Sequence, residues 1–137
     1  MGQPGSIPLP ASSERILVAD DDEAVSLFIE AVLVSQGYRV SHACNGEEAV
    51  AKYRHEGPFG LAILDVHMPK LDGLGALEQI RAFHPSVCGL VLSGMPVEDD
   101  QSVPGWAQGF DAFLAKLFDA ADLVNTVRRL LHRTKPG

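Results

Sequence analysis

Three aspartates in this chain follow apolar runs that have the character of buried strands. Asp20 and Asp21 come directly after RILVA, and Asp65 comes directly after LAIL. Two carboxylates ~4 Å apart repel by roughly 1 kcal/mol in water and by ~4 kcal/mol at the effective dielectric of a partly covered site. If the fold brings the three together, a positive group must lie among them.

The ligand atoms that these aspartates offer are all oxygens, which suit a hard cation. Mg²⁺ is the best candidate, because it takes one or two carboxylates and keeps several waters. Zinc has little support, since the histidines are scattered and the cysteines lack ligand spacing and are expected to be reduced core residues. These residues are His42, His55, His67, His84, His132, Cys44 and Cys88.

Two further polar residues follow strand-like runs. Ser93 comes after VCGLVL and Lys116 after DAFLA. A metal ion and an ammonium group can neutralise the oxygens of a phosphoryl group while a carboxylate attacks phosphorus and becomes an acyl phosphate. A nucleotide or flavin phosphate would need backbone amides from a Gly-rich first loop, and ADDDEA has no glycine. The residues therefore indicate phosphoryl transfer to a carboxylate.

Five apolar runs alternate with helical patterns and must position these residues. RILVA, LAIL and VCGLVL are nearly continuous, as in parallel strands covered on both faces, whereas YRVSHA alternates like an edge strand. Five strand–helix units in about 120 residues predict an α/β fold with a doubly wound open sheet. The edge position of the second strand favours a flavodoxin-like (βα)5 order of 2-1-3-4-5, in which ligands bind beyond the carboxyl ends of the first and third strands.

The first helical pattern has apolar residues on one side and ends near Gly37. Asp22 and Glu23 precede it as charges favoured by the helix dipole. The second pattern begins at Asn45, with Glu48 three residues on, close to a capping box. The apolar residues of the first pattern are Val25, Phe28, Ile29, Val32 and Leu33.

The remaining helical patterns differ in strength. The third is regular and ends before Pro85. The fourth contains Pro104 and Gly105, which are poor in a helix interior, so this helix is expected to be short or broken. The fifth has helical spacing from Leu123 to Leu131 and basic residues near its negative end.

Bulk properties restrict the class of protein. A chain of 137 residues predicts one domain, and a net charge of -7 disfavours contact with nucleic acid or anionic lipid. No apolar stretch reaches the length of a membrane span, and the start lacks a signal peptide, which favours a cytoplasmic location. We expect a flexible leader or linker at 1–14, one domain at 15–133 and a short tail at 134–137.

The segments ILVADDDEA, AILDVHMPKLDG, LVLSG and FLAK resemble the signature segments of a response regulator receiver domain from two-component signalling. The resemblance runs from about Arg15 to Leu131 in the order and spacing of the family. It implies that Asp65 is the phosphoacceptor and is phosphorylated by a sensor histidine kinase or a histidine phosphotransfer protein. Asp20 and Asp21 would be the acidic pair that binds Mg²⁺.

The same resemblance assigns roles to four other positions. The backbone carbonyl of His67 would be a further metal ligand, and Ser93 and Lys116 would contact the phosphoryl group. Ser93 would move inward on phosphorylation and Phe113 would follow as the aromatic switch. The surface of the fourth helix, fifth strand and fifth helix would then change and alter the docking of a small downstream partner.

Two alternatives from other classes stay open. One is a receiver that docks partners without using phosphate, although the full set of site residues argues against it. The other is a flavodoxin-like enzyme, such as a flavin carrier or an aspartate-based phosphatase. For the receiver itself we expect no enzymatic activity beyond slow self-dephosphorylation. Its parent could be a single-domain regulator, a phosphorelay intermediate or a hybrid histidine kinase.

One position departs from the family. Receivers usually place a proline directly after the lysine, commonly with a cis bond, and here Leu117 follows Lys116. A cis bond before a non-proline residue costs ~3 kcal/mol, against under ~1 kcal/mol before proline. We therefore expect a trans peptide at this position and a rerouted loop, with Lys116 less firmly positioned.

The lifetime of the phosphoryl group gives a testable prediction. In receivers, the residues two past the acceptor and two past the hydroxyl flank the path of the attacking water, and here they are His67 and Met95. Neither is a carboxylate or an amide that would orient this water, so we expect slow decay. The double variant His67→Asn with Met95→Glu should lose label faster than the wild type in a time course. Equal decay rates would contradict lifetime tuning by these residues.

Overall fold

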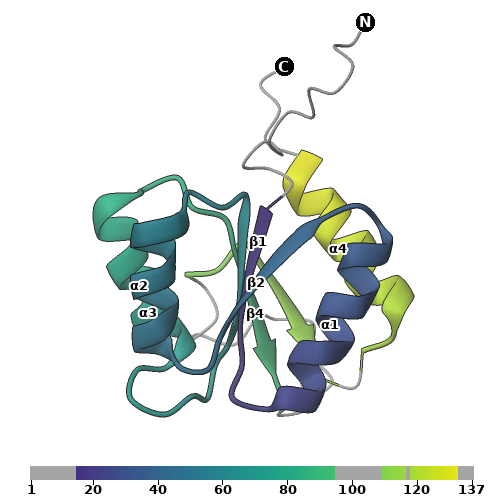
Figure 1. Ribbon diagram of the computed structural model, residues 1–137, viewed down its shortest axis with the longest axis horizontal. Coiled ribbons are helices and arrows are strands. Elements are labelled where there is room, and N and C mark those ends of the chain that lie inside the picture. The colour runs from purple at the N-terminus through teal and green to yellow at the C-terminus, as the bar shows by residue number, and fades with distance from the viewer. Residues whose placement is uncertain (1–14, 95–108, 117, 133–137) are drawn as a thin grey trace, which may run out of the picture.

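A computed structural model describes residues 15–94, 109–116 and 118–132 (Figure 1). The leader at 1–14 and the tail at 134–137 lie outside these residues. So do the expected fourth helix, with Pro104 and Gly105, and the predictions that concern Met95 and Leu117.

The strands form one parallel sheet in the order β2-β1-β3-β4-β5, which confirms the predicted flavodoxin-like α/β fold. β3 and β4 are buried along their whole length, as their continuous apolar runs predict. β2 lies at the edge of the sheet and is only partly buried, as its alternating sequence predicts. The strands are β1 (Arg15–Ala19), β2 (Arg39–Ala43), β3 (Leu61–Asp65), β4 (Gly89–Ser93) and β5 (Ala112–Ala115).

Helices cover both faces of the sheet. Figure 1 shows α2 and α3 on one face and α1 and α4 on the other, with the sheet seen nearly edge-on between them. The last of these helices corresponds to the fifth helical pattern of the sequence. The described helices are α1 (Glu23–Ser35), α2 (Gly46–Glu56), α3 (Gly73–Phe83) and α4 (Ala120–His132). None of them is long and apolar enough to cross a bilayer.

The period of two along β1 divides the core into two clusters. Leu17 and Ala19 pack beneath α2 and α3, whereas Ile16 and Val18 pack beneath α1 and α4. All four side chains are fully buried. β1 is the second strand of the sheet and is covered on both faces. Asp20 and Asp21, which follow it, are therefore attached to a firmly held strand.

Capping side chains begin three helices at the carboxyl ends of the strands. Asp22 Oδ1 accepts the N–H groups of Ala24 and Val25 and so caps α1. Asn45 Oδ1 accepts the Glu48 N–H over 2.8 Å at α2, and Asp72 Oδ1 accepts the Gly75 N–H over 2.8 Å at α3. The Glu48 carboxylate returns to the Cys44 N–H over 2.6 Å, one residue earlier than in a capping box. These caps fix where each helix leaves the sheet edge.

Two sequence expectations are wrong in detail. Cys44 is exposed just beyond the end of β2, so it is no core residue, while Cys88 is half-buried against the α1–α4 core. Phe28 was assigned to the inner side of α1, yet 42% of it is exposed. The helix is apolar on more than one side, so spacing alone did not separate the buried side from the exposed one.

Candidate functional site

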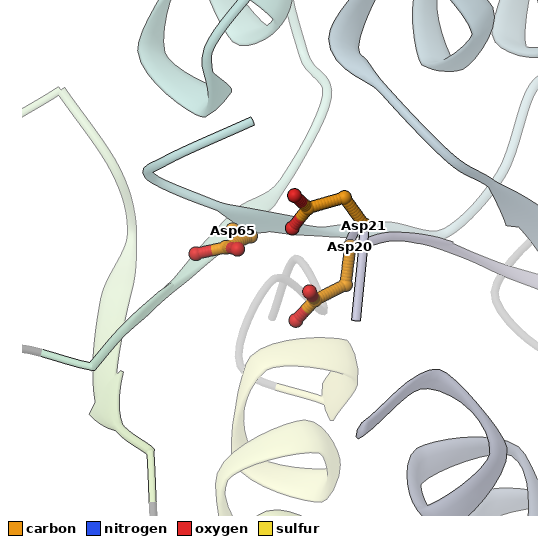
Figure 2. Close-up of side chains that lie close together, drawn as sticks. All are labelled: Asp20, Asp21 and Asp65. Atoms are coloured by element: carbon orange, nitrogen blue, oxygen red, sulfur yellow. The ribbon is translucent and has the colours of Figure 1, made fainter. Parts of the chain in front are cut away.

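The fold brings together the three aspartates of the first and third strands. β1 and β3 are neighbours, and Ala19 pairs with Leu64, so Asp20 lies beside Asp65. Each of the three aspartates has a carboxylate oxygen within 4.8 Å of one from each of the others. Figure 2 shows the carboxylates gathered at the ends of these strands. Asp20 and Asp65 are each 3% exposed, whereas Asp21 lies open to solvent.

Lys116 supplies the positive group that this cluster requires. It follows β5 and is held beside β4 by its N–H, which donates to the Ser93 carbonyl over 2.7 Å. Its Nζ lies 3.1 Å from Asp20 Oδ2 and 3.2 Å from Asp65 Oδ2. One ammonium therefore bridges two carboxylates that belong to different strands.

Backbone groups orient both buried carboxylates. The Asp22 N–H donates to Asp20 Oδ1 over 2.8 Å, and the His67 N–H donates to Asp65 Oδ1 over 3.3 Å. Asp20 Oδ2 is buried and accepts no hydrogen bond from the described residues. Lys116 Nζ lies 3.1 Å from that oxygen as an ion pair, while it donates a hydrogen bond to the other oxygen, Asp20 Oδ1, over 3.4 Å. Asp20 therefore holds one carboxylate oxygen ready for a further positive partner.

The environment changes the pKa values of the paired groups. Burial is the main reason that the pKa of Asp20 is raised to about 6, and the charge of Asp65 adds to it. The Asp22 N–H and Lys116 oppose this rise only in part. Burial would by itself lower the pKa of Lys116, yet its contacts with Asp20 and Asp65 more than offset burial and raise it. At neutral pH Lys116 is therefore charged, and the buried Asp20 carboxylate is only partly stabilised by its partners.

The donor set fits a hard divalent cation. It consists of three carboxylates, one of which has a buried oxygen without a hydrogen bond, and all three face the same point. The His67 carbonyl belongs to the loop that begins beside them, although its side chain is exposed. Oxygen ligands of this kind suit Mg²⁺ better than a metal that prefers nitrogen or sulfur.

The other predicted residues lie on the β4–β5 side. Ser93 is fully buried at the end of β4, next to the residue that pairs with Asp65. Phe113 is half-buried on β5 opposite Val91 and packs against the small cluster of Val66 and Val91. The structure thus places Ser93 beside the carboxylates and Phe113 one strand away.

Sequence reasoning missed one side of the site. A cavity of about 410 Å³ adjoins Asp20 and Asp21 and is lined also by Ser26 and His42. Ser26 Oγ donates to the Asp20 carbonyl over 3.4 Å, and His42 Nε2 lies 2.8 Å from a carboxylate oxygen of Glu30. Ser26 could have been found from the sequence, because it is a polar residue one turn into an apolar helix. The place of His42 follows only from the pairing of β2 with β1.

Comparisons with known proteins agree with this geometry. Residues 16–128 match the family model of the response regulator receiver domain. The transcriptional regulatory protein PrrA of Mycobacterium leprae is 39% identical over 122 residues, which are 89% of this chain and 52% of that protein. The chain thus spans about half the length of the curated relatives it matches.

Solved structures are similar over most of the chain. A CheY-like response regulator receiver domain protein from Methanospirillum hungatei has a TM-score of 0.79 at 28% identity, over 90% of this chain and 98% of that one. The response regulator TrrA of Thermotoga maritima, solved with Mg²⁺ and BeF, has a TM-score of 0.74 at 29% identity, over 85% and 98% of the two chains.

Burial of the Asp20 carboxylate beside Asp65 gives a prediction for stability. The unfolded chain loses the proton of residue 20 near pH 3.8, whereas the folded protein keeps it to about pH 6. Wild-type stability is therefore lost as the pH rises between these values, and Asp20→Asn removes the loss. At pH 7 without divalent cations, the variant should be more stable by up to about 3 kcal/mol, since the rise spans about two pKa units and one unit corresponds to ~1.4 kcal/mol.

Thermal unfolding at pH 3.5 and pH 7 tests this prediction. Asp22→Asn is the matched control, because it removes a neighbouring exposed charge and asparagine caps a helix as well as aspartate does. It should change the free energy of unfolding by less than about 0.5 kcal/mol. A lower Tm for Asp20→Asn than for wild type at pH 7 would show that the buried charge is compensated within the protein.

Proposed function

The chain belongs to the response regulator receiver family, and from this premise we propose that Asp65 accepts a phosphoryl group from a phosphohistidine. The donor is a sensor histidine kinase or a histidine phosphotransfer protein. One observation carries the proposal: the Asp65 carboxylate is buried at the end of β3, yet it stands in a cluster of oxygens with an ammonium 3.2 Å away. This is the arrangement that an incoming phosphoryl anion requires.

Mg²⁺ is the cofactor of the proposed reaction. Asp20, Asp21, Asp65 and the backbone carbonyl of His67 would hold it, and their oxygens fit its preference. When bound, it supplies positive charge to the phosphoryl oxygens and permits approach to an anionic pocket. Asp20 Oδ2 supports this assignment, because it is the buried oxygen that lacks a hydrogen-bond donor.

The transfer step exchanges one bond to phosphorus for another. A carboxylate oxygen of Asp65 forms the new O–P bond while the N–P bond of the phosphohistidine breaks. The imidazole leaves with the electron pair of that bond. Lys116, already 3.2 Å from Asp65 Oδ2, would move with the developing phosphoryl oxygens and offset their charge. The Ser93 hydroxyl would donate to the same group from the end of β4.

The response would then pass along β4 and β5. Ser93 would turn toward the phosphoryl group, and Phe113, packed on Val66 and Val91, would move into the space that it leaves. The altered surface around β5 would dock a downstream partner.

The outer side of α1 supports docking of the phosphoryl donor. Three of the four large exposed apolar side chains of the described residues lie on this helix, namely Leu27 (55% exposed), Phe28 (42%) and Val34 (51%). With the exposed Ala24 and Ala31 they form one stripe at helical spacing. The stripe begins beside Asp21, so a protein that covers it would also cover the mouth of the site.

A hollow next to the site extends this surface. It has a volume of about 290 Å³ and lies between Phe28 and Phe118, whose ring centroids are 6.0 Å apart. Lys116 lines the same hollow. The charged residues of α1 are Glu23 and Glu30, both acidic, which favours a donor helix with basic residues beside its apolar contacts.

The family assignment restricts the wider role. Receivers are signalling domains and generally not enzymes, and we propose at most slow self-dephosphorylation here. We propose a cytoplasmic location, where such kinases present their phosphohistidine. A hybrid kinase parent is compatible with this role. The net charge of -7 supports the proposal that this domain itself does not contact nucleic acid, whatever the longer relatives do.

Labelling with acetyl phosphate tests the phosphoacceptor. The wild type should be labelled with Mg²⁺ present and should stay at background when the metal is chelated. Asp65→Asn should stay at background in both conditions, because an amide oxygen is a poor nucleophile. Asp72→Asn is the control, since it changes an exposed aspartate of the same loop and keeps its cap. Equal labelling of Asp65→Asn, or labelling that ignores the chelator, would exclude the assignment.

A second test separates docking from chemistry. Leu27→Asp places a charge in the exposed apolar stripe and should slow phosphotransfer from the best protein donor by about tenfold, as loss of an interface anchor does. The reaction with acetyl phosphate should keep its wild-type rate. Phe83→Asp, at an exposed apolar residue on the opposite helical layer, should leave both rates unchanged. If Leu27→Asp has no effect with the protein donor, the donor docks elsewhere.

A further inference from the structure

The β3–α3 loop, residues 66–72, carries the backbone that completes the site. The Val66 N–H continues the sheet by donating to the Leu92 carbonyl of β4 over 2.9 Å, and three further N–H groups donate within the loop, to Asp65 or from the start of α3 back to the loop. These three bonds join His67 N–H to Asp65 Oδ1 (3.3 Å), Leu71 N–H to the Pro69 carbonyl (2.7 Å) and Gly73 N–H to the Val66 carbonyl (3.4 Å). They define the shape of the loop, but they do not tie it to the aspartates of β1.

One turn of this loop is strained. The bond from Leu71 to Pro69 closes a three-residue turn around Lys70, whose φ is 72°. A positive φ is unfavourable for a side chain with a Cβ, and γ-turns of this hand are rare. A strained turn persists only where its surroundings hold it. The turn at Lys70 therefore depends on the contacts that hold Leu71 in place.

Helix α2 supplies the closest contact. A Cβ on Gly46, the first residue of α2, would overlap the Leu71 carbonyl oxygen and would lie 2.6 Å from the carbonyl carbon. The backbone of α2 thus lies directly against the backbone of the loop. Met68 and Leu71 also pack into the core cluster beneath α2 and α3, which keeps the loop pressed onto the helix.

Gly46 is itself fixed to the other half of the site. The Asp20 N–H donates to the Ala43 carbonyl over 3.2 Å at the end of β2. From there the chain passes directly into the α2 cap, where Asn45 accepts the Glu48 N–H over 2.8 Å. A continuous set of backbone contacts therefore runs from Asp20 through the start of α2 to the loop that follows Asp65.

We propose that Gly46 is a positioning residue for the acidic pocket, acting through the Leu71 backbone to set the distance between the two sides of the metal site. It touches neither the metal nor the phosphoryl group. A side chain at this position would displace Leu71, turn the strained peptide at Lys70 and move the His67 backbone away from the aspartates. The inference rests on the proposed function of the pocket in binding Mg²⁺.

Gly46→Ala in the full chain tests the proposal. Mg²⁺ affinity is measured by calorimetry well below the Tm, and the His67 amide is followed in ¹H–¹⁵N spectra. We expect weaker Mg²⁺ binding by about tenfold or more, as for other residues that orient ligands, together with a shifted His67 amide.

Gly57→Ala is the matched control for Gly46→Ala. It lies at the other end of α2, where a Cβ would overlap the Tyr53 carbonyl oxygen, far from the site. It should lower the Tm to a similar degree and leave Mg²⁺ affinity unchanged. Loss of stability alone would affect both variants, so only a positioning role separates them. Equal losses of Mg²⁺ affinity in the two variants would overturn the proposal.

A milder pair of variants covers the case in which Gly46→Ala does not fold. Asn45→Ala removes the cap of α2 without a steric overlap and should weaken Mg²⁺ binding, whereas Asn45→Ser keeps a capping oxygen and should restore it. Wild-type binding by Asn45→Ala would overturn the proposal. A wild type that binds no Mg²⁺ would overturn the proposed function and this inference with it. If the wild type binds Mg²⁺ and Gly46→Ala binds it equally well, this inference alone is overturned.

Discussion

The bridge from Lys116 to Asp20 and Asp65 is the interaction on which the site depends. The parallel sheet brings three carboxylates to one edge, and one ammonium cannot neutralise them all. Burial of its carboxylate is the main reason that the pKa of Asp20 is raised, and the nearby charge of Asp65 adds to the rise. The proposed binding of a cation, and then of a phosphoryl anion, would make use of this uncompensated charge. The incompletely neutralised negative charge lowers the stability of the fold at the place where the proposed function uses that charge.

The two sides of this pocket are built differently. On the β1–β2 side, backbone hydrogen bonds and helix caps hold Asp20 and the start of α2 in a fixed relation. On the β4–β5 side, Phe113 packs against Val66 and Val91, and Ser93 is buried at the end of β4. A rigid side can hold a metal site to the accuracy that its coordination demands, and the β4–β5 side carries the two residues that we propose to move. This division suits a domain that must bind in one geometry and then signal a change.

Helix α1 joins the core beneath the acidic pocket to the surface that we propose for docking of the phosphoryl donor. Its inner side packs Ile29 and Leu33 into the core, and its outer side exposes Leu27, Phe28 and Val34. A helix with two apolar sides is costly for a monomer in water, because the outer side gains nothing until it is covered. The outer side begins at the mouth of the acidic pocket, so the phosphoryl donor that we propose to cover it would be brought directly to Asp65.

The sequence by itself determined the strands and their order, and it indicated which residues the structure then brings together as a candidate site. Short continuous apolar runs that alternate with helical patterns indicate parallel strands covered on both faces, and the polar residue that ends each run then lies at the ligand-binding edge of the sheet. The sequence could not decide which side of α1 is buried, because apolar residues occur on both. Nor could it show that Gly46 meets Leu71, that His42 borders the aspartates or that Lys116 reaches two of them at once. Those contacts join residues far apart in the chain, and local patterns contain no distances between such residues. Only the tertiary packing of strands and helices decides them.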